Sequence, residues 1–216
     1  MGKGSKLSQN WVEDFVEKLS NVEGRFELYA AIFLKYDNRY NLVIKDSKDW
    51  VYENDRRKAP LSTFGGKIEN RTDPVKFLQD YCSRELETNI TIYDSNHTYI
   101  DYHHRLKKIP VDLVKGGIKP FLITILQKAR HSANSNRLIF SYLGEAKYKP
   151  HYAKYSAMVY ASERVLVQMF KTEKSVQELK KAGATIDERI KIPDYLYLFP
   201  TGSLNSLLRY LSYEVF

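Results

Sequence analysis

The sequence contains a single cysteine, Cys82, in 216 residues. One cysteine excludes an internal disulfide and any zinc site built from cysteines. Cys82 falls at an apolar position of a predicted helix, so a small buried side chain explains it better than a nucleophile does.

Long apolar stretches are also missing. The chain has no run of about 20 apolar residues that could span a membrane, and its start, Met1 to Lys6, lacks the apolar stretch of a secretory signal. We therefore expect a cytoplasmic protein without a membrane partner. Hydrophobic residues make up 43% of the chain, and no repeat, low-complexity segment or linker divides it, so one main domain is expected.

Residue spacings of common catalytic centres are likewise absent. The sequence shows no Ser-His-Asp arrangement, no P-loop and no zinc-ligand spacing. His103 and His104 are adjacent and, on a predicted strand, would point to opposite faces, which is poor geometry for a metal. The other histidines are isolated: His97, His131 and His151.

Positive charge is in excess, with a formal net charge of +8 and a pI of about 9.3. Such a balance favours polyanionic partners, among them nucleotides, nucleic acids and ribosomal surfaces. Arg56, Arg57 and Lys58 precede a glycine pair and are candidates to flank a bound phosphate, although solvated loop charge is the commoner explanation. Segment 147–155 interleaves basic and aromatic residues, which suits RNA, but 17 tyrosines also produce such interleaving by chance.

The apolar periodicity predicts mixed secondary structure. Residues 11–22 are expected to form an amphipathic helix, segment 47–63 is expected to be polar and irregular, and 158–170 is ambiguous. A helix is predicted to begin at Pro74, because Asp73 is a favourable N-cap and proline is favourable at the first helical position. Strands are predicted at 28–35 and 40–45, joined as a hairpin across Asp37-Asn38-Arg39, and further strands at 98–102, 121–126 and 138–143. Further helices are predicted at 176–181 and after Gly202-Ser203.

The most specific pattern is Gly65-Gly66-Lys67-Ile68-Glu69 followed by Arg84-Glu85-Leu86. This pattern resembles the two halves of a Nudix box, the family motif in which a loop, a helix and a loop hold divalent metal against a diphosphate. The resemblance implies an α+β fold, an α/β/α sandwich with a mixed sheet, the Nudix helix and a C-terminal helix. It implies a domain over residues 24–216, preceded by an extra helical extension at 1–23.

The sequence departs from the family pattern in the middle of the box and after it. Arg84 comes four residues later than the family spacing, which adds about one helical turn and roughly 40° of rotation. The family's following glutamates are replaced by Thr88 and Asn89. Positions 85, 88 and 89 are spaced to share one helical face, and this face carries only one carboxylate, Glu85. Because hard divalent cations need charged oxygen ligands, metal affinity is expected to drop steeply.

The resemblance nevertheless assigns roles to individual residues. It makes Glu85 and Arg84 catalytic, and Glu85 with Glu69 the ligands of Mg²⁺ or Mn²⁺, if the protein is active. Retention of Arg84 and Glu85 is equally explained by an ion pair that stabilises the loop and helix. The substrate-binding candidates are Gly65, Gly66, Lys67, Arg56 and Arg57, and a distant carboxylate that restores the metal site would be Glu145, Glu163 or Glu188.

Two functions therefore remain open. The first is a divergent, metal-dependent hydrolase of nucleoside diphosphate-linked substrates. The second is a Nudix-fold module without hydrolysis, which binds a nucleotide or RNA or serves as a subunit of a larger complex.

Overall fold

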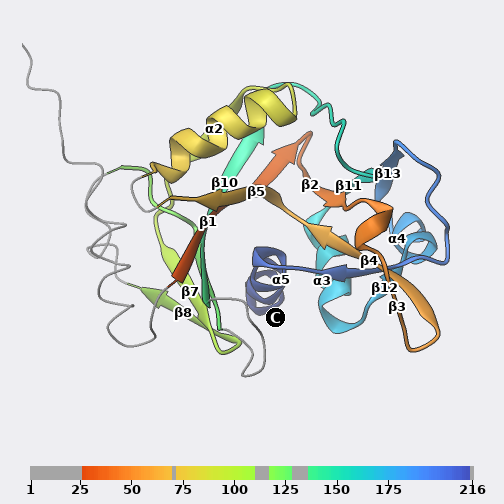
Figure 1. Cartoon of the computed structure of the whole chain (residues 1–216). Coiled ribbons are helices and arrows are strands. Elements are labelled where there is room, and N and C mark those ends of the chain that lie inside the picture. Colours follow the sequence, from red (N-terminus) through yellow and green to blue (C-terminus); the bar gives the residue numbers. More distant parts are fainter. Residues whose placement is uncertain (1–25, 70–71, 110–116, 128–135, 215–216) are drawn as a thin grey trace, which may run out of the picture.

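A computed structural model describes residues 26–69, 72–109, 117–127 and 136–214. The predicted N-terminal helix at 11–22 and the boundary near residue 23 lie outside these residues. The described part is a mixed sheet with helices on both faces, which confirms the predicted α+β fold (Figure 1).

The centre of the sheet is the parallel pair of β1 (Phe26–Tyr36) and β10 (Asn136–Ala146). Each of these long strands changes partner along its length, because β1 pairs first with β5 and then with β2, while β10 pairs with β9 and β6. The strands that complete the sheet are β2 (Arg39–Ile44), β3 (Val51–Glu53), β4 (Arg56–Ser62), β5 (Phe64–Ile68), β6 (Ile90–Tyr93), β7 (Thr98–Tyr102), β8 (Arg105–Ile109), β9 (Leu122–Leu126), β11 (Ala157–Ala161), β12 (Lys174–Ser175), β13 (Thr185–Glu188) and β14 (Tyr197–Pro200).

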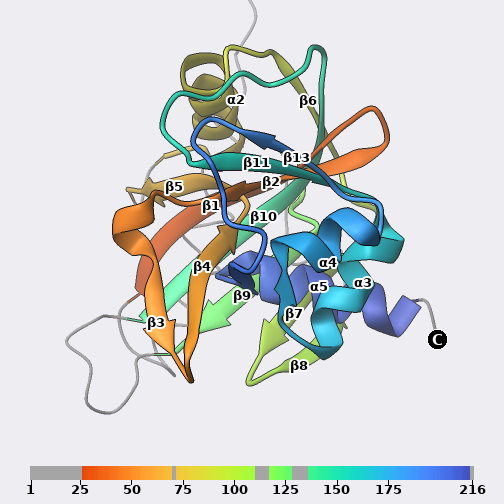
Figure 2. The ribbon, with the colours of Figure 1, turned by 90° about the vertical axis from the view of Figure 1, so that its right-hand side faces the viewer.

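Two apolar cores lie on the two faces of the sheet. Helix α2 (Pro74–Glu85) covers one face, where its buried Leu78 and Cys82 pack with Phe64 and Phe140. Helices α3 (Glu163–Lys171), α4 (Val176–Lys181) and α5 (Ser203–Glu214) lie on the other side (Figure 2). No helix among the described residues is long and apolar enough to cross a membrane.

The predicted hairpin between β1 and β2 is confirmed. Its two turn residues, Asp37 and Asn38, have φ values of 52° and 57°. Asparagine and aspartate tolerate this left-handed conformation better than most residues, and the resulting turn matches the twist of the flanking strands.

The prediction that segment 47–63 is irregular is wrong. A short 3-10 helix, η1 (Ser47–Asp49), is followed by the β3–β4 hairpin, which turns at Asn54 and Asp55 with φ values of 50° and 58°. All three residues of β3 are exposed, so this edge strand shows no apolar alternation in the sequence. The first residues of β4, Arg56 and Arg57, are also exposed and polar, so they give no apolar alternation either.

Helix α2 begins where the sequence predicts. The side chain of Asp73 accepts a hydrogen bond of 2.9 Å from the amide of Val75, and Pro74 is the first helical residue. Cys82 is fully buried, as predicted, and burial raises the pKa of its thiol to about 12. A thiol that stays protonated at neutral pH is a poor nucleophile, so Cys82 is a core residue.

The ambiguous stretch 158–170 divides into β11 and the start of α3. Ser162 caps α3, and its side chain accepts from the amide of Val165 at 3.5 Å. Helix α4 matches its predicted range, and Ser175 with Glu178 forms a capping box at its start. Helix α5 begins at Ser203, as Gly202-Ser203 predicts.

Candidate functional site

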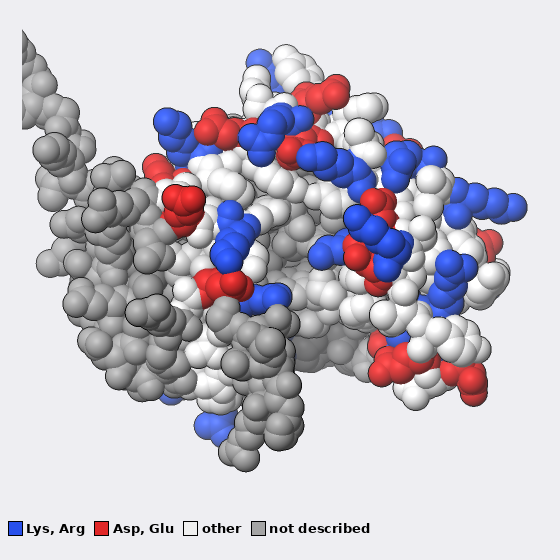
Figure 3. Space-filling model, in the orientation of Figure 1, with Lys and Arg blue, Asp and Glu red and all other residues white. Residues whose placement is uncertain are grey.

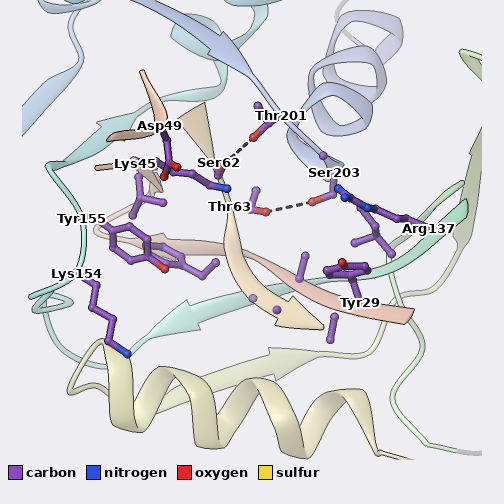
Figure 4. Close-up of a pocket in the computed structure, with 18 of the residues that line it drawn as sticks. Tyr29, Lys45, Asp49, Ser62, Thr63, Arg137, Lys154, Tyr155, Thr201 and Ser203 are labelled. Atoms are coloured by element: carbon purple, nitrogen blue, oxygen red, sulfur yellow. Dashed lines mark hydrogen bonds between the residues drawn. The ribbon is translucent and has the colours of Figure 1, made fainter. Parts of the chain in front are cut away.

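A cleft of about 710 Å³ opens between β1, the β4–β5 junction and the start of α5 (Figure 4). Residues far apart in the sequence line it: 29–31, 43, 45–46, 48–49, 62–66, 126, 137, 139, 154–155 and 201–203. Two hydroxyl pairs join the β4–β5 junction to the start of α5. Ser62 lies 2.6 Å from Thr201, and Thr63 lies 3.1 Å from Ser203.

Gly65 and Gly66 both line the cleft, as the substrate-binding prediction requires. Gly65 also has a structural role, since its φ is 140° and a Cβ atom there would lie 2.0 Å from the carbonyl oxygen of Ala30. At Gly66 a Cβ atom would lie 3.3 Å from the ring of Phe77. The absence of a Cβ atom at Gly65 therefore lets β5 lie directly against β1.

The cleft carries more positive than negative charge. Its lining contains four cationic residues, Lys45, Lys48, Arg137 and Lys154, and two acidic residues, Asp46 and Asp49. Asp46 is held by Arg189 at 3.2 Å. Such a lining favours an anionic ligand.

Glu85, the carboxylate retained from the Nudix pattern, is bound by two cations. Its Oε2 atom lies 2.5 Å from Nζ of Lys154, and its Oε1 atom accepts from Nε of Arg84 at 2.9 Å. Lys154 and then Arg84 lower the pKa of Glu85, so the carboxylate is ionised at neutral pH. Figure 4 shows Lys154 at the wall of the cleft, with its ammonium directed toward α2.

The expected helical face of positions 85, 88 and 89 does not form. Helix α2 ends at Glu85, and Glu87 has a φ of 49°, which turns the chain out of the helix. Thr88 is buried, and its hydroxyl donates to the carbonyl of Tyr148 at 3.2 Å. Asn89 is exposed, and its carbonyl accepts from the amide of Lys147.

The other predicted binding residues lie outside the cleft lining. Lys67 forms an ion pair of 2.6 Å with Glu27. The guanidinium groups of Arg56 and Arg57 stack on aromatic rings, at 4.5 Å over Tyr197 of β14 and 4.7 Å over Trp50, which precedes β3. An ion pair and two cation–aromatic contacts of this kind stabilise the surface of the protein.

The predicted metal ligands belong to no cluster of three or more possible ligands among the described residues. Glu69 is exposed at the end of β5. The three distant carboxylates are held by other groups: Glu145 by the hydroxyl of Tyr93, Glu163 by Lys35, and Glu188 by Lys180. The described residues contain no group of three or more histidine, cysteine, aspartate or glutamate side chains that could hold a metal. With Lys154 and Arg84 bound to Glu85, the residues present do not fit a Mg²⁺ or Mn²⁺ site.

The basic and aromatic side chains of segment 147–155 mainly contact the rest of the chain. Lys149 pairs with Asp187 at 2.8 Å, and the hydroxyl of Tyr155 lies 2.5 Å from that of Tyr81. On the face seen in Figure 3, lysine and arginine lie beside acidic side chains rather than in one basic patch. RNA binding by this segment stays a prediction.

The histidine pair does not lie on a strand. His103 and His104 form the turn between β7 and β8, with φ values of 49° and 60°. Nδ1 of His104 lies 3.1 Å from the guanidinium of Arg209, so this histidine belongs to a structural polar cluster.

Several residues of the cleft are not predicted as site residues from the sequence. Lys45, Lys48 and Arg137 are isolated basic residues in separate segments of the chain, and Ser203 is the first residue of α5. No local pattern marks them, because their segments meet through the pairing of β1 with β5 and β10, the pairing of β2 with β4, and the contact of Thr63 with Ser203.

Comparison with known proteins gives structural likenesses only. No protein-family model and no curated protein sequence matches the chain. Similar solved structures include a NUDIX-family hydrolase from Clostridium perfringens, with 11% identity, coverage of 89% of this chain and 99% of that chain, and a TM-score of 0.46. The E. coli ORF135 protein has 12% identity, coverage of 67% and 79%, and a TM-score of 0.42. A UDP-X diphosphatase has 7% identity, coverage of 94% and 71%, and a TM-score of 0.39. These values place the chain in no family, so its site is interpreted from its own residues.

Proposed function

We propose that this chain is a Nudix-like module that binds a phosphorylated ligand, a nucleotide or nucleoside diphosphate derivative, in the cleft without hydrolysing it. The single observation that carries this proposal is the ion pair between Lys154 and Glu85 at the cleft wall. The carboxylate that would hold a catalytic metal is bound by an ammonium group of the chain itself.

The shape and charge of the cleft support a nucleotide-sized anion. Its volume of about 710 Å³ lies within the usual range for small-molecule sites. Lys45 and Lys48 both line the cleft, and no ion-pair partner is found for either among the described residues. The rings of Tyr29 and Tyr155 also line the cleft and offer apolar surface to a base.

The absence of a helical face with several carboxylates at positions 85, 88 and 89 supports binding without hydrolysis. In metal-dependent hydrolysis the ion activates water and neutralises the phosphate charge, and several carboxylates must hold it. Here α2 ends at Glu85, and Thr88 beyond it is buried against Tyr148. These positions supply one carboxylate, which already has two cationic partners.

The test is a hydrolysis screen in millimolar Mg²⁺ or Mn²⁺ with dinucleotides, nucleotide sugars, ADP-ribose, capped RNA and nucleoside triphosphates. We expect no turnover above the buffer control, because the chain lacks the ligands that hold a catalytic metal. The Glu85→Gln variant is assayed beside the natural chain, with product release as the readout. Rapid turnover that Glu85→Gln abolishes would overturn the proposal and establish the hydrolase alternative.

A further inference from the structure

Lys154 occupies a position between the retained carboxylate and the cleft. Its Nζ atom lies 2.5 Å from Glu85, yet its side chain is 70% exposed and lines the cleft. An ammonium group has three N–H donors, and the contact with Glu85 uses one of them. Lys154 can therefore donate to a ligand oxygen while it stays bound to Glu85.

The charges around Lys154 leave a net positive site. Arg84 and Lys154 contribute two positive charges against the single negative charge of Glu85. Both oxygens of Glu85 already accept hydrogen bonds from these cations, so the carboxylate has little capacity to bind a hydrated metal. A phosphate oxygen, in contrast, would meet a fixed cation at this wall.

We propose that Lys154 takes the place of a divalent metal in ligand binding, so that the cleft selects the metal-free form of a diphosphate over its Mg²⁺ complex. This inference rests on the proposed function and specifies which form of the ligand the cleft binds. Mg²⁺ bound to a diphosphate cancels the negative charge that a cationic cleft recognises. Of the two carboxylates that line the cleft, Asp46 already pairs with Arg189, and Asp49 alone does not make a metal site.

The test measures binding of ADP-ribose by calorimetry, once in EDTA and once in millimolar Mg²⁺. The natural chain is expected to bind in EDTA and to bind more weakly in Mg²⁺. Lys154→Met should weaken binding in EDTA by about ten- to a hundredfold, the usual effect of removing one charge-assisted hydrogen bond. Lys154→Arg should retain most of the affinity.

Lys35→Met is the matched control. Lys35 also pairs with a glutamate, at 3.1 Å, and its side chain is 36% exposed, but it lies outside the cleft lining. Its replacement removes the same charge and should leave the affinity within about twofold of the natural value. Thermal unfolding of both variants checks that each is folded.

The Glu85→Gln variant distinguishes ligand binding by Lys154 from metal binding by Glu85, because the two predict opposite changes in affinity. If Lys154 is the ligand-binding cation, removal of the competing carboxylate should tighten binding several-fold in EDTA. If Glu85 holds a metal, the same change should weaken binding, and only in Mg²⁺.

Two outcomes would overturn the inference. One is binding that requires Mg²⁺, and the other is equal affinity for the natural chain and Lys154→Met. If Lys45→Met weakens binding while Lys154→Met does not, the cleft remains the ligand site and only the role of Lys154 is lost. Failure of the natural chain to bind ADP-ribose or inorganic pyrophosphate in either buffer would refute the proposed function as well.

Discussion

Gly65→Ala is expected to lower the free energy of unfolding by more than about 3 kcal/mol. Gly65 has a φ of 140°, and a Cβ atom there would lie 2.0 Å from the carbonyl oxygen of Ala30 and 2.8 Å from the Cα atom of Ala31. Backbone strain of this kind costs about 1–3 kcal/mol, and the clash adds to it because β1 and β5 must separate. Urea unfolding measures the change.

Gly183→Ala is the control for backbone strain alone. Gly183 has a φ of 102°, but no atom lies within 4 Å of the position of an added Cβ. This variant should lose about 1–2 kcal/mol, clearly less than Gly65→Ala. Equal losses for the two variants would show that the close approach of β5 to β1 does not limit position 65.

Asp101→Ala is expected to destabilise the protein by about 3–5 kcal/mol. Asp101 on β7 forms an ion pair with Arg209 on α5, and both side chains are largely buried, with exposed fractions of 6% and 13%. Removal of the carboxylate leaves the guanidinium buried without its main partner. Differential scanning calorimetry and urea unfolding both report the loss.

An exposed pair and a double variant serve as controls. Lys67→Ala breaks the pair with Glu27, where the side chains are 61% and 31% exposed, and should destabilise the protein far less than Asp101→Ala. Replacing Asp101 and Arg209 together by leucine should cost less than Asp101→Ala, because no buried charge is then left unpaired. A double variant less stable than Asp101→Ala would contradict this explanation.

The sequence predicts those elements whose signals are local. Asp73 and Pro74 specify the start of α2, and the Asp37-Asn38 turn specifies the first hairpin. Strands with buried residues, such as β1 and β9, carry the apolar run that this burial requires. The exposed edge strand β3 and the polar strand β8 do not, because solvent on their faces removes the need for apolar residues.

The candidate site is predicted only in part. The glycine pair and Glu85 are found by motif, but the end of α2 at Glu85 is not, since the sequence around Leu86 permits a longer helix. Lys154 is distant in sequence from both, and its contact with Glu85 depends on the path of segment 147–155 over the end of α2. A contact set by tertiary packing leaves no periodic signal in the sequence.

The central claim is that the cleft binds a diphosphate and leaves it intact. Phosphorus-31 NMR of ADP-ribose mixed with the protein tests both parts in one sample, first in EDTA and then after addition of Mg²⁺. The account predicts that the diphosphate resonances shift or broaden in EDTA, that Mg²⁺ partly reverses this change, and that no phosphomonoester signal develops. Diphosphate resonances unchanged by the protein, or their conversion to phosphomonoester signals after Mg²⁺ is added, would contradict it.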